Sequence, residues 1–304
     1  MASRAPRLSG ALSRGQKEFG WDRRARGVFI RSYCIHAGRG RASPLFESWQ
    51  SANAAEALGG MSEPSLLSTK PIDPRDRLIF ALDVPTQAEA LQWVDRLGDA
   101  VTFYKVGFQL FMAEGYWELV EALKARSKKV FVDLKFFDVP ETVKNAVANL
   151  AKRGVECCTV HGTQAILEGA VAVKGSMKVL AVTVLTALDR GDLDDLGFQC
   201  DVAELVYSRA RRALEIGCDG VISSGLEAER LRKGLGGRLL IVTPGIRPVE
   251  NREADDQKRT MTLIDAFRSG ADHVVVGRPI RQAADPRAKA LEMQAEIAAL
   301  FTAP

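Results

Sequence analysis

The sequence predicts a single α/β domain of the (β/α)8 type, the TIM barrel, preceded by an N-terminal extension. The main observation is that short apolar runs alternate with helical patterns along most of the chain. Short apolar runs bounded by turn residues or charges are typical of buried strands, and eight of them with intervening helices favour a closed parallel barrel. The eight runs lie at 78–83, 103–107, 130–135, 155–161, 179–185, 220–223, 239–243 and 273–277.

Several predicted helices carry their own start and stop signals. Thr86 and Glu89 have the spacing of a capping box, and Gly98 is a stop signal at the end of the same helix. A proline one or two residues after Asp138 and Asp285 indicates the start of two later helices. These signals support the division into strands and helices independently of the apolar runs.

Composition is consistent with one compact domain and an unusual N-terminus. The chain has 304 residues, of which 46% are hydrophobic and 26% charged, which is enough for the core of one large domain or two small ones. Its formal net charge is +4, but residues 1–60 carry ten of the 42 basic residues and four of the 38 acidic ones. Residues 61–304 are therefore slightly acidic, and we expect no nucleic-acid partner there.

Residues 1–60 form an Arg-rich extension that we expect to be disordered, ahead of a TIM-barrel domain at 61–304. They lack sustained periodicity and any apolar run long enough for a signal sequence or a membrane span. Three interpretations stay open: a translated stretch upstream of the natural start, an organelle targeting segment, or a basic interaction arm. Met61, followed by a short polar lead-in to the first strand, favours the first.

Cysteine usage favours a reducing compartment, and we expect a cytoplasmic enzyme. The five cysteines are odd in number and have no CxxC spacing, so they suggest neither a disulfide framework nor a zinc site. Cys157 and Cys158 fall in an apolar run, where small buried hydrophobic residues are expected.

Charged and polar residues fall at the ends of most of the apolar runs. The functional groups of a TIM barrel stand at the C-terminal ends of its strands, so these residues are the candidates for a functional site. They are Asp83, Lys105, Asp133, Lys135, His161, Thr186, Arg247 and Arg278. For His161 a structural role is favoured over a role in the site.

Asp133 and Lys135 lie two residues apart on the third run, so their side chains share one face of the strand. With Val130 and Val132 also apolar, we expect this charged pair at the mouth of an otherwise dry barrel. The alternative is a salt bridge that only closes the barrel, although a buried ion pair is costly unless fully partnered.

Lys105 lies in an apolar setting, where a lysine needs a nearby carboxylate to stay charged. Asp133 and Asp138 are the expected partners, although Asp138 could equally be a helix N-cap. Alternating lysines and aspartates leave no unpaired position for a further anion, so a substrate carboxylate held there would be destabilised. A carbanion formed in its place could be protonated by an ammonium group, and this suggests loss of carbon dioxide.

Two Gly-flanked arginines point to a phosphate group on the substrate. Pro244-Gly245-Ile246-Arg247 follows the seventh run, and Gly277-Arg278 follows the eighth. Barrels commonly bind phosphate with the loops after these two strands, where backbone N–H groups and guanidinium groups supply charge-assisted hydrogen bonds. The alternative is that both arginines are ordinary surface residues.

Two loops are long and polar enough to cover the site. The loop after the fifth run, at 186–200, includes the stretch 189–195, in which most residues are charged, and a similarly polar insertion at 247–258 follows the seventh run. Long loops at this end of a barrel are typical of lids that close over a substrate.

Together these motifs resemble the orotidine 5′-phosphate decarboxylase family, bacterial type, in their order and approximate spacing from about residue 78 to 301. The lysine of the second run and the TPGIR element distinguish this family from the wider group of barrels that share a DxKxxD element. The motifs are Ala81-Leu82-Asp83, Lys105-Val106-Gly107, Asp133-Leu134-Lys135-Phe136-Phe137-Asp138-Val139-Pro140, Thr183-Val184-Leu185-Thr186, Thr243-Pro244-Gly245-Ile246-Arg247 and Val276-Gly277-Arg278.

The resemblance implies decarboxylation of orotidine 5′-monophosphate to UMP, with no metal or organic cofactor. Lys135 is then the proton donor to C6 of the pyrimidine, and Asp133 crowds the substrate carboxylate. Lys105 completes the array with Asp138. In the family, this second aspartate reaches into the partner subunit's site, so Asp138, with Thr142 a turn later, implies a homodimer with shared active sites.

The resemblance also assigns the substrate-binding residues. Asp83 is similar to the ribose-binding aspartate, and Thr186 to a residue that contacts the pyrimidine from the lid. The residues implied around the phosphate are Pro244, Arg247, Gln257, Gly277 and Arg278.

Two other functions remain as alternatives. One is a magnesium-dependent hexulose-phosphate synthase or keto-gulonate-phosphate decarboxylase of the same superfamily, which would need an acidic residue in place of Lys105. The other is a catalytically idle barrel whose Arg-rich arm binds RNA or a membrane surface.

Overall fold

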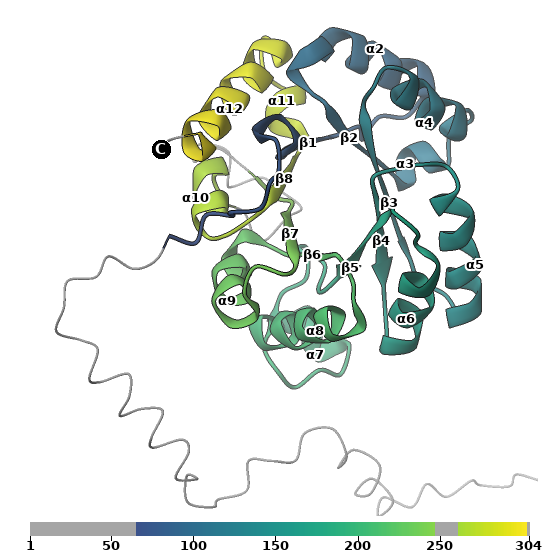
Figure 1. Cartoon of the computed structure of the whole chain (residues 1–304), viewed down its shortest axis with the longest axis vertical. Helices are drawn as coiled ribbons and strands as arrows, with labels where there is room; N and C mark the ends of the chain where they lie inside the picture. Colours follow the sequence, from purple (N-terminus) through teal and green to yellow (C-terminus); the bar gives the residue numbers. More distant parts are fainter. Residues whose placement is uncertain (1–64, 247–260, 303–304) are drawn as a thin grey trace, which may run out of the picture. The chain divides into compact units, whose positions relative to one another are not determined.

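The computed structural model describes residues 65–246 and 261–302, and in this part the fold is a closed barrel of eight parallel strands. The strands pair in sequence order, and β8 pairs with β1 to close the sheet. Figure 1 shows the helices arranged as a ring outside the strands. The predicted (β/α)8 fold is confirmed.

Each observed strand overlaps one predicted run. Several end earlier than predicted, so that polar residues such as Asp83 lie on the loops that follow the strands. The strands are β1 (Leu78–Ala81), β2 (Phe103–Gly107), β3 (Lys129–Phe136), β4 (Cys157–His161), β5 (Lys178–Val182), β6 (Gly220–Ile222), β7 (Leu240–Thr243) and β8 (His273–Val276).

Helices connect successive strands and cover the outer face of the sheet. They are α2 (Gln87–Leu97), α3 (Phe108–Phe111), α4 (Tyr116–Ala125), α5 (Pro140–Ala151), α6 (Gln164–Val173), α7 (Arg190–Asp195), α8 (Val202–Ile216), α9 (Gly225–Leu235), α10 (Leu263–Arg268), α11 (Arg278–Arg281) and α12 (Pro286–Phe301). Two 3₁₀ turns, η2 (Pro74–Asp76) and η3 (Gly98–Ala100), lie beside them.

Most of the predicted helix signals are confirmed. The Thr86 side chain accepts a hydrogen bond from the backbone N–H of Glu89, and the Asp285 side chain caps α12 in the same way. Asp138 is different, because the N-cap of α5 is Val139, and the Val139 side chain makes no cap hydrogen bond. The carboxylate of Asp138 instead accepts from the Val139 N–H at 2.6 Å. The prediction of Asp138 as N-cap is therefore wrong.

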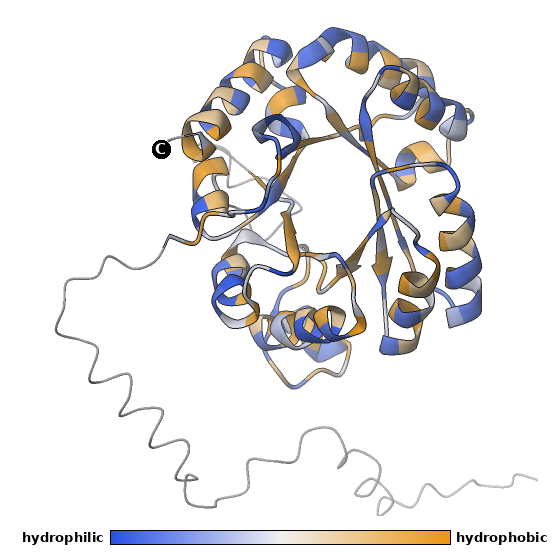
Figure 2. Ribbon diagram, viewed as in Figure 1, coloured by the Kyte–Doolittle hydropathy of each residue, from blue (hydrophilic) through white to orange (hydrophobic). Residues whose placement is uncertain are grey.

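The core has two layers, one inside the barrel and one between the sheet and the helices. The inner layer is Ile79, Ala81, Phe103, Phe131, Cys157, Leu180, Val242 and Val275. Figure 2 shows strands that are mainly hydrophobic within a ring of helices of mixed character. Cys157 is buried in the inner layer and Cys158 in the outer one, as expected of small hydrophobic residues.

The two layers correct one expectation about β3. Val130 and Val132 belong to the outer layer, whereas Phe131 faces the barrel interior. Because side chains alternate along a strand, Asp133 shares the face of Phe131 and not that of the valines. The interior below Asp133 is therefore apolar, but it is built from other residues than predicted.

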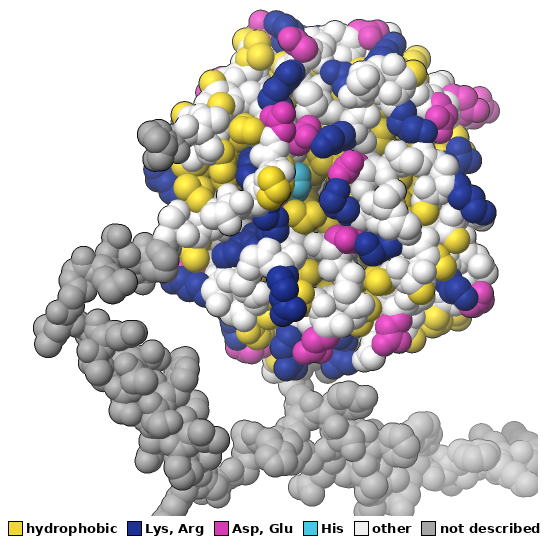
Figure 3. Space-filling view, viewed as in Figure 1, with side chains coloured by type: hydrophobic (Ala, Val, Ile, Leu, Met, Phe, Trp, Pro, Cys, Tyr) yellow, Lys and Arg dark blue, Asp and Glu magenta, His cyan; other side chains and the backbone are white. Residues whose placement is uncertain are grey.

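Ion pairs occupy the N-terminal ends of the strands. Lys129 pairs with Asp76 at 2.6 Å, and Lys178 pairs with Glu156. Figure 3 shows basic and acidic side chains in alternation near the middle of the face that it presents. These pairs lie at the end of the barrel away from the C-terminal strand ends, where the functional site is predicted, so we expect them to support the fold.

A buried carboxylate ties the segment before β1 to the barrel. Asp272, directly before β8, is fully buried and accepts from the Ser68 hydroxyl, the Lys70 ammonium at 2.9 Å and the Arg232 guanidinium at 2.8 Å. Burial raises the pKa of Asp272, but the charge of Arg232 and the bonds from Ser68 and Lys70 outweigh it, so the net pKa is lowered. The carboxylate is thus ionised, and residues 68–70 are part of the domain.

We expect Asp272→Asn to lower the free energy of unfolding by at least about 3 kcal/mol, because it leaves Lys70 and Arg232 without a buried counter-charge. Urea denaturation would measure the loss. Glu292→Gln is the matched control, since Glu292 belongs to an exposed pair with Lys289 and its loss should cost less than about 1 kcal/mol. Equal losses in the two variants would contradict the proposed anchor.

Candidate active site

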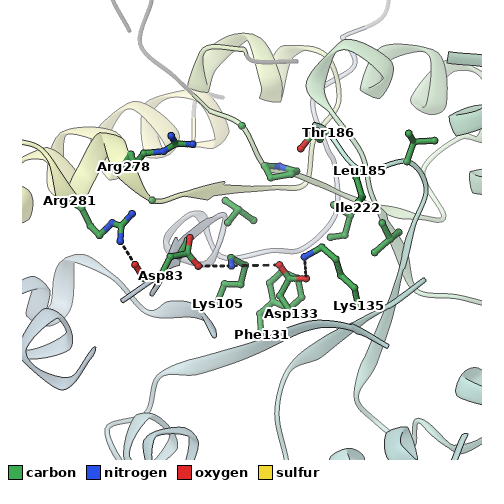
Figure 4. Close-up of a pocket in the computed structure, with 17 residues that line it drawn as sticks. Asp83, Lys105, Phe131, Asp133, Lys135, Leu185, Thr186, Ile222, Arg278 and Arg281 are labelled. Atoms are coloured by element: carbon green, nitrogen blue, oxygen red, sulfur yellow. Dashed lines mark hydrogen bonds and ion pairs between the residues drawn. The ribbon is translucent and has the colours of Figure 1, made fainter. Parts of the chain in front are cut away.

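A cavity of about 260 Å³ opens at the C-terminal ends of the strands, where the sequence predicted the functional site. Its lining includes many of the predicted residues, and Figure 4 shows them converging from several strands. The predicted residues in the lining are Asp83, Lys105, Asp133, Lys135, Thr186, Pro244, Gly277 and Arg278. Asp138 and Thr142 are exposed and do not line it, and Arg247 and Gln257 lie outside the described residues.

Four charged side chains form an alternating row across the floor of this cavity (Figure 4). Lys105 Nζ lies 3.0 Å from Asp83 Oδ1 and 3.6 Å from Asp133 Oδ2. Lys135 Nζ lies 2.9 Å from Asp133 Oδ1. The predicted alternation of acid and base is therefore present within one chain.

Within the single chain, the place beside Lys105 that was predicted for Asp138 is taken by another carboxylate. Asp83, and not Asp138, is the second carboxylate beside Lys105. Lys105 lies on β2 between β1 and β3, so it reaches the carboxylates that follow β1 and lie on β3. Asp138 lies beyond the end of β3, exposed, and its carboxylate turns back to the N–H of the next residue.

The protonation of the inner pair is set by competition between burial and charge. Burial alone lowers the pKa of the Lys105 ammonium, but the charges of Asp133 and Asp83 outweigh it and the net pKa is raised. Burial alone raises the pKa of Asp133, but the charges of Lys105 and Lys135 outweigh it and the net pKa is lowered. Both groups are therefore charged at neutral pH.

Lys135 differs from Lys105 in exposure and in backbone conformation. Its side chain is 34% exposed, against 13% for Lys105, so its ammonium is the more accessible from the cavity. Its φ of 48° lies in the left-handed region, which costs a residue with a side chain on the order of 1 kcal/mol or more. Such strain at a reactive side chain is typical of functional sites.

The opposite end of the cavity is basic. Gly277 and Arg278 follow β8, and Pro244 and Gly245 follow β7, so that the two predicted phosphate elements lie on neighbouring strands. Gly245 has a φ of 81°, which a side chain would strain, and this explains the glycine of the turn. Between the two ends, the wall is apolar and includes Val182, Val184, Leu185 and Ile222.

Arg281 is a residue of the cavity that the sequence analysis missed. It lies on α11 three positions after Arg278, and its guanidinium donates to the backbone carbonyl of Asp83 (Figure 4). It therefore links the basic end of the cavity to the loop that presents Asp83. The i, i+3 spacing of the two arginines on one helix turn could have predicted this.

The segment 186–200 after β5 is braced by its own hydrogen bonds. Asp189 and Asp192 form a capping box at the start of α7. Arg190 donates to the carbonyls of Phe198 and Cys200 at 3.1 and 2.5 Å. Thr186, at the start of this segment, contributes to the cavity lining, so a structured element lies beside the site.

His161 lies at the end of β4 but does not line the cavity. Its ring meets the ring of Phe137 edge to face, with the centroids 5.2 Å apart. Burial, followed by the charges of Arg209 and Lys135, lowers its pKa, so the imidazole is neutral at pH 7. These contacts favour the structural role.

No group of three or more histidine, cysteine, aspartate or glutamate side chains in the described part of the chain has a geometry that could hold a metal ion. Among the same residues, no helix combines the length and the apolar character of a membrane span.

The fold and the site define an enzyme of the TIM-barrel class, and comparison with known proteins gives its family. The model of the orotidine 5′-phosphate decarboxylase / HUMPS family matches residues 76–293. An orotidine 5′-phosphate decarboxylase of Methylococcus capsulatus is 63% identical over 240 residues, which are 79% of this chain and 99% of that protein. One of Xanthomonas campestris pv. campestris is 49% identical over 241 residues, 79% of this chain and 97% of its own.

A solved structure agrees with these matches. The crystal structure of orotidine 5′-phosphate decarboxylase from Lactobacillus acidophilus has a TM-score of 0.64 and 33% identity, and the match covers 73% of this chain and 99% of that one. The chain belongs to the orotidine 5′-phosphate decarboxylase / HUMPS family.

The lowered pKa of Asp133 has a consequence for stability. A carboxylate whose folded-state pKa lies below its unfolded value stabilises the fold above the unfolded pKa, near pH 4, and this contribution is lost as the pH falls through the folded value. Asp133→Asn keeps the shape and removes the charge. We therefore expect the difference in free energy of unfolding between wild type and Asp133→Asn to shrink between about pH 5 and 3.

Urea denaturation across this pH range would measure the difference. A difference that stays constant with pH would mean that Asp133 is not held ionised by its two lysines.

Proposed function

We propose that this protein decarboxylates orotidine 5′-monophosphate to UMP and carbon dioxide, the last step of de novo pyrimidine nucleotide synthesis. The activity follows from family membership and from 63% identity to a decarboxylase, in a match that covers 99% of that relative. The observation in this chain that supports it best is the row Asp83, Lys105, Asp133, Lys135 across the cavity floor. The row offers both a negative charge to repel a carboxylate and an ammonium to protonate a carbanion.

We infer that Asp133 crowds the substrate carboxylate. It is ionised at neutral pH, and its side chain is only 13% exposed, so little water would screen the repulsion. The bond between C6 and the carboxylate breaks, carbon dioxide leaves, and the electron pair stays on C6. Because this repulsion is relieved in the transition state, it speeds the chemical step instead of only weakening binding.

We assign the proton transfer to Lys135. Its ammonium lies 2.9 Å from Asp133 Oδ1, so it is close to the position from which the carboxylate departs. Transfer of its proton to C6 gives UMP and a neutral amine, which regains a proton from solvent. Lys105 is more deeply buried between two carboxylates and is assigned to holding the charge of the row.

The remaining residues are assigned to binding. Asp83 binds the ribose, Thr186 contacts the pyrimidine, and an arginine-rich group at the other end of the cavity binds the phosphate. The proposed phosphate residues are Pro244, Arg247, Gln257, Gly277 and Arg278. Binding energy from the phosphate, which is remote from C6, closes the segments at 186–200 and 247–258 and drives the carboxylate toward Asp133.

We propose a homodimer in which Asp138 and Thr142 of each chain reach the site of the partner. An exposed apolar surface supports this proposal. Met112 is 79% exposed and Phe137 65%, and both lie near the rim of the barrel after the neighbouring strands β2 and β3. Apolar surface of this kind is typical of an interface with another protein. The same two segments also carry exposed apolar side chains at Phe108, Phe111 and Val139.

We further propose that the catalytic domain spans residues 61–304, with residues 1–60 dispensable for chemistry, and that the enzyme is cytoplasmic. The cysteines in the described part of the chain are all free thiols, which supports a reducing compartment. The magnesium-dependent enzymes of the superfamily remain the main rival, although Lys105 stands where they need an acidic ligand.

The first test is the fall in absorbance of orotidine 5′-monophosphate with purified residues 61–304 and EDTA present throughout. We expect full turnover, because the row needs no metal to hold its charges. Turnover that appears only with magnesium and a sugar phosphate would move the assignment to the metal-dependent rival.

Absence of turnover under both conditions would favour the catalytically idle barrel. That alternative also predicts salt-sensitive RNA binding by the full chain that disappears when residues 1–60 are removed.

The second test concerns the shared site. We expect Lys135→Ala to lose nearly all turnover yet still bind UMP, and Asp138→Asn to lose most of it. When the two inactive variants are mixed and allowed to exchange subunits, half the dimers are mixed and one of their two sites is intact, so about a quarter of the wild-type activity should return.

The matched control is a mixture of Lys135→Ala and Asp133→Asn. Both residues belong to the same chain's row, so every mixed dimer has two damaged sites and no activity should return. Recovery in both mixtures, or in neither, would exclude the proposed sharing through Asp138.

A further inference from the structure

The third strand departs from regular pairing beside its catalytic residues. Phe131 and Val132 pair with Cys157 and Cys158, but the next pair is Phe136 with Val160. Between these pairs β3 contains three residues, 133–135, whereas β4 contains only Thr159. The two residues assigned to chemistry therefore lie in a β-bulge, opposite a single threonine.

Thr159 occupies the gap in the ladder that the bulge creates. Its side-chain hydroxyl accepts a hydrogen bond from the backbone N–H of Lys135 at 2.9 Å. Lys135 has a φ of 48°, which a lysine adopts only where its surroundings hold it there. The bond from Lys135 to Thr159 is thus one of the contacts that hold the strained residue.

The same hydroxyl also bonds to the carboxylate of the row. Thr159 Oγ1 lies 2.8 Å from Asp133 Oδ1, the oxygen that also receives the Lys135 ammonium at 2.9 Å. A backbone N–H can only donate, so the hydroxyl accepts from Lys135 and its own proton is left for Asp133. A donor aimed at a carboxylate stabilises the ionised form.

Burial gives this arrangement its strength. Thr159 is 0% exposed, and the Asp133 side chain is 13% exposed, so water does not compete freely for either bond. One hydroxyl on β4 therefore bonds to both the strained backbone of the proton donor and the repelling carboxylate.

We propose that Thr159 is a positioning residue for the decarboxylation. Through its one hydroxyl it fixes the Lys135 backbone in the bulge and orients the ionised Asp133 carboxylate, so that the donor and the repelling group keep a constant separation. This inference rests on the proposed function, because it refines how the same site works. The competing explanation is a purely structural threonine that satisfies a buried backbone N–H.

The test compares Thr159→Val, which keeps the shape but removes the hydroxyl, with Thr159→Ser, which keeps the hydroxyl. We expect kcat to fall at least about tenfold in Thr159→Val, while the dissociation constant of UMP changes less than about threefold, because the lost bonds act on the reacting groups. Thr159→Ser should recover most of kcat.

The pH profile separates positioning from structure. Without the hydroxyl donor the ionised form of Asp133 is less stabilised, so the acid limb of kcat should move to higher pH in Thr159→Val and return in Thr159→Ser. Thr183→Val is the matched control, since Thr183 is also 0% exposed and donates its hydroxyl to the carbonyl of Ile222. It should lose similar stability and keep the wild-type acid limb.

Two results would overturn the proposal. One is a Thr159→Val variant whose kcat lies within about twofold of wild type and whose acid limb falls at the same pH as in wild type. The other is a Thr159→Ser variant that is folded, by its thermal denaturation, and yet as impaired as Thr159→Val. If the wild type itself does not turn over orotidine 5′-monophosphate, the proposed function fails instead. Titration of the Asp133 carboxyl by NMR in wild type and in Thr159→Val still tests whether the Thr159 hydroxyl stabilises the ionised carboxylate.

Discussion

Asp133 stands in a buried position between two ammonium groups, and the rest of the site is arranged around keeping it ionised there. A lone carboxylate at this depth would take up a proton, because burial disfavours the charged form. Lys105 and Lys135 reverse this tendency, and the pKa of Asp133 is lowered despite its burial. The charges of Asp133 and Asp83 in turn raise the pKa of Lys105 despite its burial, so Asp133 and Lys105 keep each other charged.

The barrel supplies the geometry that such a row requires. Strands β1, β2 and β3 are neighbours, and their C-terminal ends place Asp83, Lys105 and Asp133 side by side. Because the sheet is closed, the apolar inner layer below the row excludes water from beneath it. The charged side chains therefore open only toward the cavity, from which a substrate would enter.

Much of this could be predicted from the sequence, because strand periodicity and helix signals are local. The eight strands and the positions of Lys105, Asp133 and Lys135 follow from patterns within a few residues. The partner of Lys105 could not be predicted in this way. Which carboxylate reaches it depends on the order of strands in the sheet, and Asp83 is 22 residues distant in sequence but on the adjoining strand end.

The bulge in β3 escaped prediction for a similar reason. A lysine with positive φ has no signal of its own in sequence, since glycine and asparagine are the residues that mark this conformation. The left-handed Lys135 exists because β3 and β4 differ in length between two fixed pairs, which is a property of two strands together. Thr159 was missed because both of its partners, the Lys135 N–H and the Asp133 carboxylate, lie on another strand.

The pairing of Lys105 with Asp83 also bears on the proposed dimer. The Asp83 side chain is 45% exposed, whereas that of Asp133 is 13% exposed, so Asp83 can leave the row at less cost than Asp133. In the proposed dimer the partner's Asp138 would take its place beside Lys105. Asp83 would then be released toward the cavity, where the ribose is expected to bind. Under this proposal, one carboxylate completes the row in a single chain and binds substrate in the dimer.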